Sequence, residues 1–170
     1  MVQTKKHLYM KHLIIGTLVT LILGMAGVIS AGQSQYKVYQ NARFDYSISY
    51  PAKILFPQGE ATNGDGQRFL SKDGKAELIV YGSHNALDQT LNDVFLDEQR
   101  QTEEHPHRTV TYKLLKADWF VVSGFDGETI FYQKTLLKHG IFKTFRITYP
   151  KNQKSTFDPI TTVIAKSFRG

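Results

Sequence analysis

The segment Pro57–Gln67 contains the oxygen-bearing side chains and the glycines that a cation-binding loop requires. Glu60, Asn63 and Asp65 are interspersed with glycines along this segment. Because carboxylate and amide oxygens are the ligands that Ca²⁺ prefers, calcium binding is the first chemistry to test.

The EF-hand template requires oxygen ligands at positions 1, 3, 5 and 12 and glycine at position 6. If Asn63 and Asp65 occupy positions 3 and 5, Ala61 falls at position 1 and Lys72 at position 12, so two key ligands are missing. We therefore predict a turn-rich loop at Gly59–Gly66 and not a metal site. Its length makes it a candidate binding loop, with Glu60, Asn63 and Asp65 as candidate contacts for a ligand or partner.

A second metal-ligand pattern is the pair His105 and His107. Two imidazoles need a third ligand to hold zinc, and none lies nearby in the sequence. We predict that these histidines are solvated, with His105 at the negative end of a helix. No metal or other cofactor is predicted, and His105 and His107 are kept only as the candidates for metal binding.

Nucleophilic catalysis is suggested by the adjacent Ser83 and His84. The sequence around them is not a Gly-x-Ser-x-Gly elbow, and a serine next to a histidine in sequence seldom has the geometry of a catalytic triad. We predict a polar loop here and assign no catalytic residue.

Trp119 is the remaining candidate, because an indole can stack on a sugar or on a partner protein. It directly precedes Phe120–Val122, which is apolar on both faces and therefore indicates a central strand covered on both sides. We expect Trp119 to anchor the core and keep it as a candidate for partner binding.

Apolar and polar residues alternate through much of the chain, which predicts strands. The predicted strands cover residues 44–50, 54–56, 69–70, 78–81, 109–115, 119–125, 129–137 and 141–149. Short polar turns such as Asp126-Gly127 join neighbours as antiparallel pairs.

Two segments have helical spacing instead. Thr90 and Asp93 form a capping-box pattern that predicts a helix over 90–103. Asp158 and Pro159 predict the start of a C-terminal helix, with Asp158 as the N-cap. The sequence thus predicts an α+β fold, with a mainly antiparallel sheet of about six to seven strands flanked by helices.

The N-terminus has the order of an export signal. Lys5, Lys6 and Lys11 precede an uncharged apolar run over 13–29, which ends in small residues. This order is typical of a secretory signal peptide, and an uncleaved signal anchor in the inner membrane is the alternative. We predict a signal peptide over 1–31, a linker over 32–42 and a single domain over 43–170, located in the periplasm or secreted.

Composition excludes several classes of function. Three of the 21 Lys and Arg residues precede Gly32 and all 15 Asp and Glu residues follow it, so the formal charge falls from +6 to +3 without the leader. The remaining basic residues are scattered, which argues against nucleic acid as a partner. The chain has no cysteine, which excludes disulfides and thiolate metal sites. Membrane contact is expected only through an uncleaved N-terminal segment.

The strand motif Arg43–Pro51, a long meander and a helix that ends Ala165–Phe168 resemble the PsbP-like superfamily. This superfamily includes the Ran-binding Mog proteins and the DcrB-type exported bacterial proteins. The resemblance covers most of residues 40–170 and implies an α/β/α sandwich. It also implies a binding, assembly or chaperone module without a shared active site, so no functional residue is carried over.

We therefore expect a non-enzymatic binding or assembly module of the cell envelope, with an envelope protein or another envelope component as its partner. One alternative is a hydrolase or metal-dependent enzyme with its site at the Gly59–Gly66 loop, which requires Glu60, Asp65 and the histidines to converge. The other is a small-ligand carrier, which requires an enclosed apolar cavity between sheet and helix.

Overall fold

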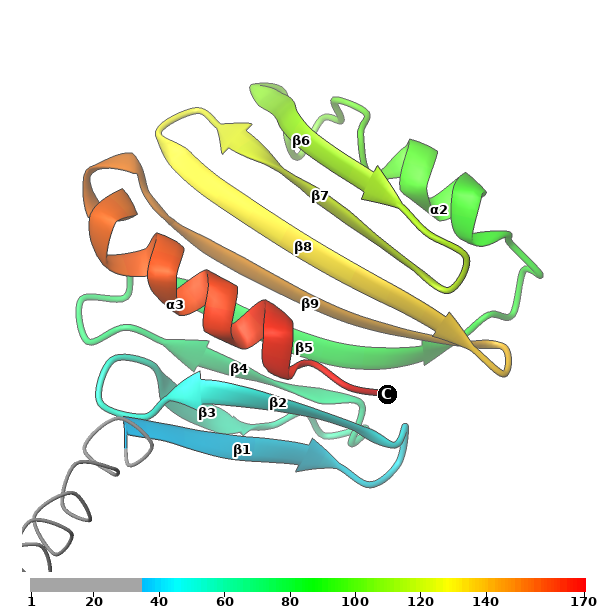
Figure 1. Cartoon of the computed structure of the whole chain (residues 1–170), viewed down its shortest axis with the longest axis horizontal. Helices are drawn as coiled ribbons and strands as arrows, with labels where there is room; N and C mark the ends of the chain where they lie inside the picture. The colour runs from blue at the N-terminus through cyan, green and yellow to red at the C-terminus, as the bar shows by residue number, and fades with distance from the viewer. Residues whose placement is uncertain (1–34) are drawn as a thin grey trace, which may run out of the picture. The chain divides into compact units, whose positions relative to one another are not determined.

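The computed structural model describes residues 35–170 (Figure 1). The predicted signal peptide over 1–31 lies outside the described residues. In chain order the strands and helices are β1 (Tyr36–Asn41), β2 (Tyr46–Pro51), β3 (Phe56–Glu60), β4 (Gly66–Leu70), β5 (Glu77–His84), α2 (Leu91–Asp97), β6 (Arg108–Leu115), β7 (Trp119–Asp126), β8 (Thr129–Lys138), β9 (Ile141–Pro150), the 3₁₀ turn η2 (Lys151–Gln153) and α3 (Lys154–Ser167).

Seven strands form one antiparallel sheet in the order β3-β4-β5-β9-β8-β7-β6. Strands β1 and β2 pair separately as a two-stranded sheet. The predicted meander is confirmed, because β6 to β9 follow one another through short turns and each pairs with the next. The predicted α+β class with a mainly antiparallel sheet is also confirmed.

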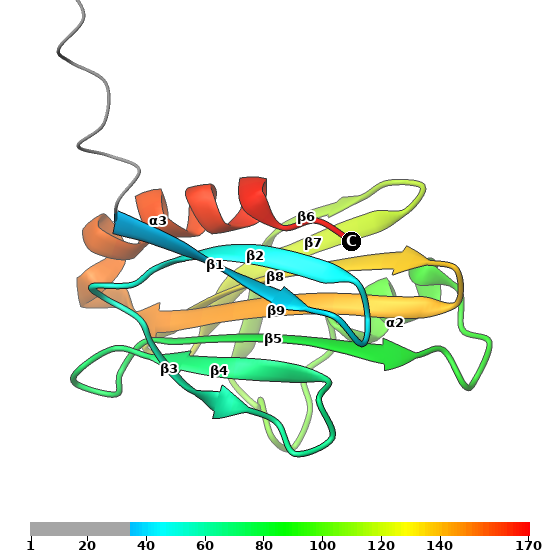
Figure 2. The same cartoon turned by 90° about the horizontal axis from the view of Figure 1, so that it is seen from below.

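One face of the large sheet is covered by α3 and by the β1–β2 hairpin, which lie side by side (Figures 1 and 2). The strands direct Phe69, Leu78 and Phe145 to this face, where all three are fully buried. Ile164 and Phe168 at the end of α3 pack against them. Each such side chain contributes about 1.5–3 kcal/mol by leaving water, so this cluster is the main core.

The opposite face of the sheet is covered by α2. Leu91 of this helix packs with Phe120, Val122, Phe131 and Phe142 from strands β7 to β9. Since α3 and α2 lie on opposite faces, the α/β/α layering implied by the sequence resemblance is present.

Helix α2 is shorter than predicted, since it ends at Asp97 and not near Glu103. Its predicted start is confirmed: Thr90 is the N-cap and makes a complete capping box with Asp93. The helix ends early because no apolar residue continues its buried stripe after Phe95.

The start of α3 was predicted wrongly. Asp158 is not the N-cap, because the helix begins at Lys154 and contains Pro159 in its interior. Phe157 is only 3% exposed and stacks on Tyr149 with ring centroids 5.2 Å apart, so the preceding turn is held by packing. Proline removes one helical hydrogen bond, to the carbonyl of Ser155, which is exposed and can bind water instead.

Two segments expected to be irregular contain strands. Residues 36–41 of the expected linker over 32–42 form β1, which pairs with β2 along its whole length. The loop expected at Gly59–Gly66 is reduced to residues 61–65, because its ends belong to the hairpin strands β3 and β4. Alternation is poor in both segments, so pairing with a neighbour decides their conformation.

Within residues 35–170, no helix has the length and apolar character needed to cross a membrane.

We predict that Phe168→Ala destabilises the protein by about 3–5 kcal/mol, because it leaves a cavity in the main core. Phe168 is 2% exposed and its ring lies edge-on to Phe145 at 5.1 Å. Val163→Ala on the outer side of the same helix, where Val163 is 41% exposed, is the control and should change stability by less than about 0.5 kcal/mol. Urea unfolding measures both, and equal effects would contradict this account of the core.

Candidate functional site

The residues predicted from the Gly59–Gly66 loop hold the β1–β2 hairpin against β3. Glu60 accepts hydrogen bonds from the hydroxyl of Tyr39 at 2.8 Å and from the amide of Asn41 at 3.0 Å. Asn63 donates to Asp65 at 2.7 Å within the turn itself. These internal bonds explain the polar residues of the loop without a ligand.

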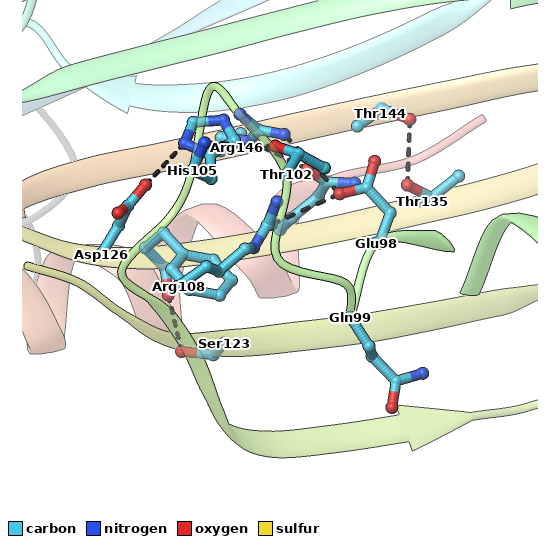
Figure 3. Close-up of polar contacts among 12 residues, drawn as sticks. Glu98, Gln99, Thr102, His105, Arg108, Ser123, Asp126, Thr135, Thr144 and Arg146 are labelled. Carbon is cyan, nitrogen blue, oxygen red and sulfur yellow. Dashed lines mark hydrogen bonds and ion pairs between the residues drawn. The ribbon is translucent and has the colours of Figure 1, made fainter. Parts of the chain in front are cut away.

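The histidines lie apart from this loop. His105 contacts Asp126 through Nδ1 and Oδ2 at 2.5 Å (Figure 3), while His107 is exposed. Among residues 35–170, no group of three or more His, Asp and Glu side chains is placed to hold a metal ion. His84, at the end of β5, lies against the ring of Phe44 with centroids 5.2 Å apart.

Trp119 does line a pocket. This pocket lies toward the β6 edge of the sheet, at the end opposite β3 and β4. The pocket is a groove of about 550 Å³ between α3 and strands β6 to β8. We call it the Trp119 groove. Its lining residues are Thr111, Tyr112, Trp119, Val121, Ser123, Gly124, Phe125, Ile130, Tyr132, Lys134, Tyr149, Lys154, Asp158, Thr161, Thr162, Ala165 and Lys166.

The groove exists because α3 covers only part of its face of the sheet. The helix lies over β8 and β9, whereas β6 and β7 continue beyond it (Figure 1). The register between β7 and β8 places Val121 opposite Lys134 and Ser123 opposite Tyr132. The strands therefore form a floor in which apolar and polar side chains alternate. Successive turns of α3 form the wall.

Lys134 is the charged group of the groove floor and is half-buried. Burial lowers the pKa of its ammonium, and the nearby Arg169 lowers it further. Its Nζ lies 5.2 Å from the centroid of the Trp119 ring and donates to the carbonyl of Ala165 at 3.3 Å. The ion pairs formed within residues 35–170 do not include Lys134. Asp118 offsets part of the lowered pKa of Lys134. The direct contacts of the ammonium are a ring face and a carbonyl, and within residues 35–170 no carboxylate lies at ion-pair distance from it.

The carboxylate in the wall is already engaged. Asp158 accepts a hydrogen bond from the Tyr149 hydroxyl at 2.8 Å and forms an ion pair with Lys154. Burial, together with the bond to Asp158, raises the pKa of Tyr149 to about 12, so this phenol stays protonated and donates. With Lys134 and Lys166 added, the lining has an excess of positive charge.

Of the candidate site residues predicted from the sequence, Trp119 alone lines this groove. Lys134 and Tyr132 were missed. The available signal was that β8 directs Ile130, Tyr132 and Lys134 to one face, where a polar group interrupts an apolar row. A strand pattern shows which residues share a face, but not whether a helix covers that face.

Comparison with known proteins supports the fold and nothing finer. The solution structure of cyanobacterial PsbP (CyanoP) from Synechocystis sp. PCC 6803 matches with a TM-score of 0.61 at 15% sequence identity, covering 86% of this chain and 98% of that one. No protein-family model matches the chain, and no curated protein matches it in sequence. The chain therefore has the PsbP-like fold, as its sequence motifs indicated.

The burial of Tyr132 in the groove leads to a prediction about stability at alkaline pH. Burial raises the pKa of Tyr132 to about 12, above the ordinary value of about 10. The native state thus binds this proton more tightly than the unfolded state, so the free energy of unfolding falls as the pH rises from about 10 toward 12. Tyr132→Phe should make this fall shallower, measured by urea unfolding over that range. A variant that loses stability as steeply as the wild type would contradict the burial of this phenol.

Proposed function

We propose that this protein is an exported binding module of the cell envelope and that the Trp119 groove binds an apolar, acidic segment of a partner protein. Lys134 carries this proposal. A half-buried ammonium without a carboxylate partner, beside an open aromatic surface, is a site that an acidic group of the occupant completes.

The form of the groove favours a protein segment over a small-ligand carrier. Tyr112, Thr162 and Lys166 line it and are exposed, so the groove is open to solvent along one side. A carrier requires an enclosed cavity that removes most of its ligand from water. Exposed aromatic and charged groups around an apolar centre are instead typical of protein interfaces.

The positions of the residues that an enzyme would need also favour a binding function over an enzymatic one. Glu60 and Asp65 lie at the β3–β4 turn, whereas His105 lies after α2 on the opposite face from the groove. A hydrolase or metal-dependent enzyme would require these groups to meet in one pocket, and they line separate surfaces.

Export is the second part of the proposal, and the order of charges before the apolar run over 13–29 supports it. We expect the protein in the envelope or periplasmic fraction with its N-terminus near residue 31 or 32. Fractionation followed by N-terminal sequencing measures this. An intact N-terminus in the cytosolic fraction would contradict export and leave the groove proposal untouched.

The chain has a single tryptophan, so the fluorescence of Trp119 reports on the groove directly. We expect a synthetic peptide of alternating leucine and glutamate to shift and saturate this emission. Lys134→Gln should weaken the binding about tenfold, because the charge-assisted contact is lost. Lys37→Gln, at an exposed position of β1, makes the same charge change away from the groove and should leave binding unchanged.

Two comparison ligands make the test decisive. A peptide with lysine in place of glutamate should not bind, and equal binding of the two peptides would contradict the role of Lys134. Saturable binding of dodecanoate, with none of the acidic peptide, would favour the small-ligand carrier instead. An affinity that is the same in Lys134→Gln and the wild type would also overturn the proposal.

A further inference from the structure

A second pocket lies on the opposite face of the sheet, between the segment that follows α2 and strands β6 to β9. Its volume is about 240 Å³. Arg108 and Arg146 line it together with Thr129 and Thr148. Two arginines in one small pocket on a rigid sheet are unusual enough to require an account of their hydrogen bonds.

Arg108 is nearly buried, with 7% of its surface exposed. Its guanidinium lies over the ring of Phe131, 4.3 Å from the centroid, and its Nη2 donates to Glu98 at a long 3.3 Å. Its Nε has no hydrogen-bond partner among the described residues. Burial lowers the pKa of Arg108, which Glu98 only partly offsets. A buried guanidinium with unused N–H groups is costly unless an acceptor joins it.

Arg146, on β9, is held by a residue of the neighbouring strand β8. Its Nε donates at 2.9 Å to Gln133, which is 1% exposed, and its Nη2 lies 3.6 Å from the same oxygen of Glu98 that Arg108 contacts. One carboxylate oxygen therefore serves two guanidinium groups, and neither contact is short. Glu98 orients both arginines without satisfying either.

Asp126 is the carboxylate among the lining residues of the pocket, and it has its own partner. Asp126 contacts His105 at 2.5 Å (Figure 3), and both residues line the pocket together with Arg108 and Arg146. Glu98 and Asp126 together balance the two arginines in formal charge. What the pocket lacks is therefore acceptor atoms for N–H donors, which a planar or tetrahedral oxyanion supplies in pairs.

We propose that this pocket binds a small molecule through a carboxylate or phosphate group, held by Arg108 and Arg146 with the hydroxyls of Thr129 and Thr148 as further donors. The site is separate from the Trp119 groove, since the two lie on opposite faces of the sheet. It does not depend on the proposed function of that groove.

Inorganic phosphate and succinate are the two probes, and the Nε–Hε signals of the arginines in ¹H–¹⁵N spectra are the readout. We expect one probe to shift the Arg108 signal in a saturable way below about 10 mM, and the probe that binds more tightly identifies the oxyanion. Sodium chloride at equal ionic strength controls for screening and should not reproduce the shift. No shift with either probe would overturn the proposal.

Arg146→Lys keeps the charge but removes the fork of donors, and it should weaken binding about tenfold. Arg68→Lys is the matched control, because Arg68 is an exposed arginine on β4 that pairs with Glu77 outside the pocket. Its affinity should equal that of the wild type. Equal affinity in Arg146→Lys and Arg68→Lys would show that the arginines serve only to hold Glu98.

Asp126→Asn is a second test of binding against a purely structural role, and here binding is expected to become tighter. Removing this negative charge from the pocket should tighten phosphate binding severalfold, whereas it should weaken the fold if the cluster is only structural. Unfolding measurements on the same variant show that the protein is intact. Weaker binding by a folded Asp126→Asn protein would contradict the proposal.

Discussion

The seven-stranded sheet has two apolar faces, and only three elements are present in residues 35–170 to cover them. The β1–β2 hairpin and α3 lie over β4, β5, β9 and part of β8, while the short α2 covers part of the other face (Figure 1). Burial of apolar area is the main stabilising term in a domain of this size. The strongest packing is therefore concentrated around Phe145 and Phe168, and on the face that carries α3 the strands β7 and β6 are left without a covering helix.

Both candidate sites follow from this incomplete coverage. Where α3 stops short of β7, the exposed strip of sheet becomes the Trp119 groove, and Lys134 lies half-buried at its floor. Where α2 ends at Asp97, the segment after it crosses the other face and brings Glu98 over Arg108 and Arg146. Both sites share strands β7, β8 and β9, which pair with one another in regular register. The edge strand β6 completes each site and has a register shift at Val110 and Tyr112.

Local signals predicted the elements well where short-range physics decides them. The capping box of Thr90 and Asp93 and the turns of the β6–β9 meander depend on residues close in the chain, and both are present. The start of α3 was misplaced because Pro159 is the strongest local signal for a helix start. The helix begins one turn earlier, since the buried ring of Phe157 packs against Tyr149 and holds that turn in place. Strand β1 was missed since its conformation depends on pairing with β2 rather than on its own alternation.

The candidate sites were harder to predict than the fold. Trp119 was identified by its type alone, and the loop residues Glu60 and Asp65 stood out because polar residues and glycines are adjacent there. Alternation, turn residues and capping depend on neighbours along the chain, and these determined the antiparallel α+β architecture from the sequence. Which half of a face remains open, and which charges meet on it, was decided only in the tertiary structure, because those contacts join residues that lie far apart in the sequence.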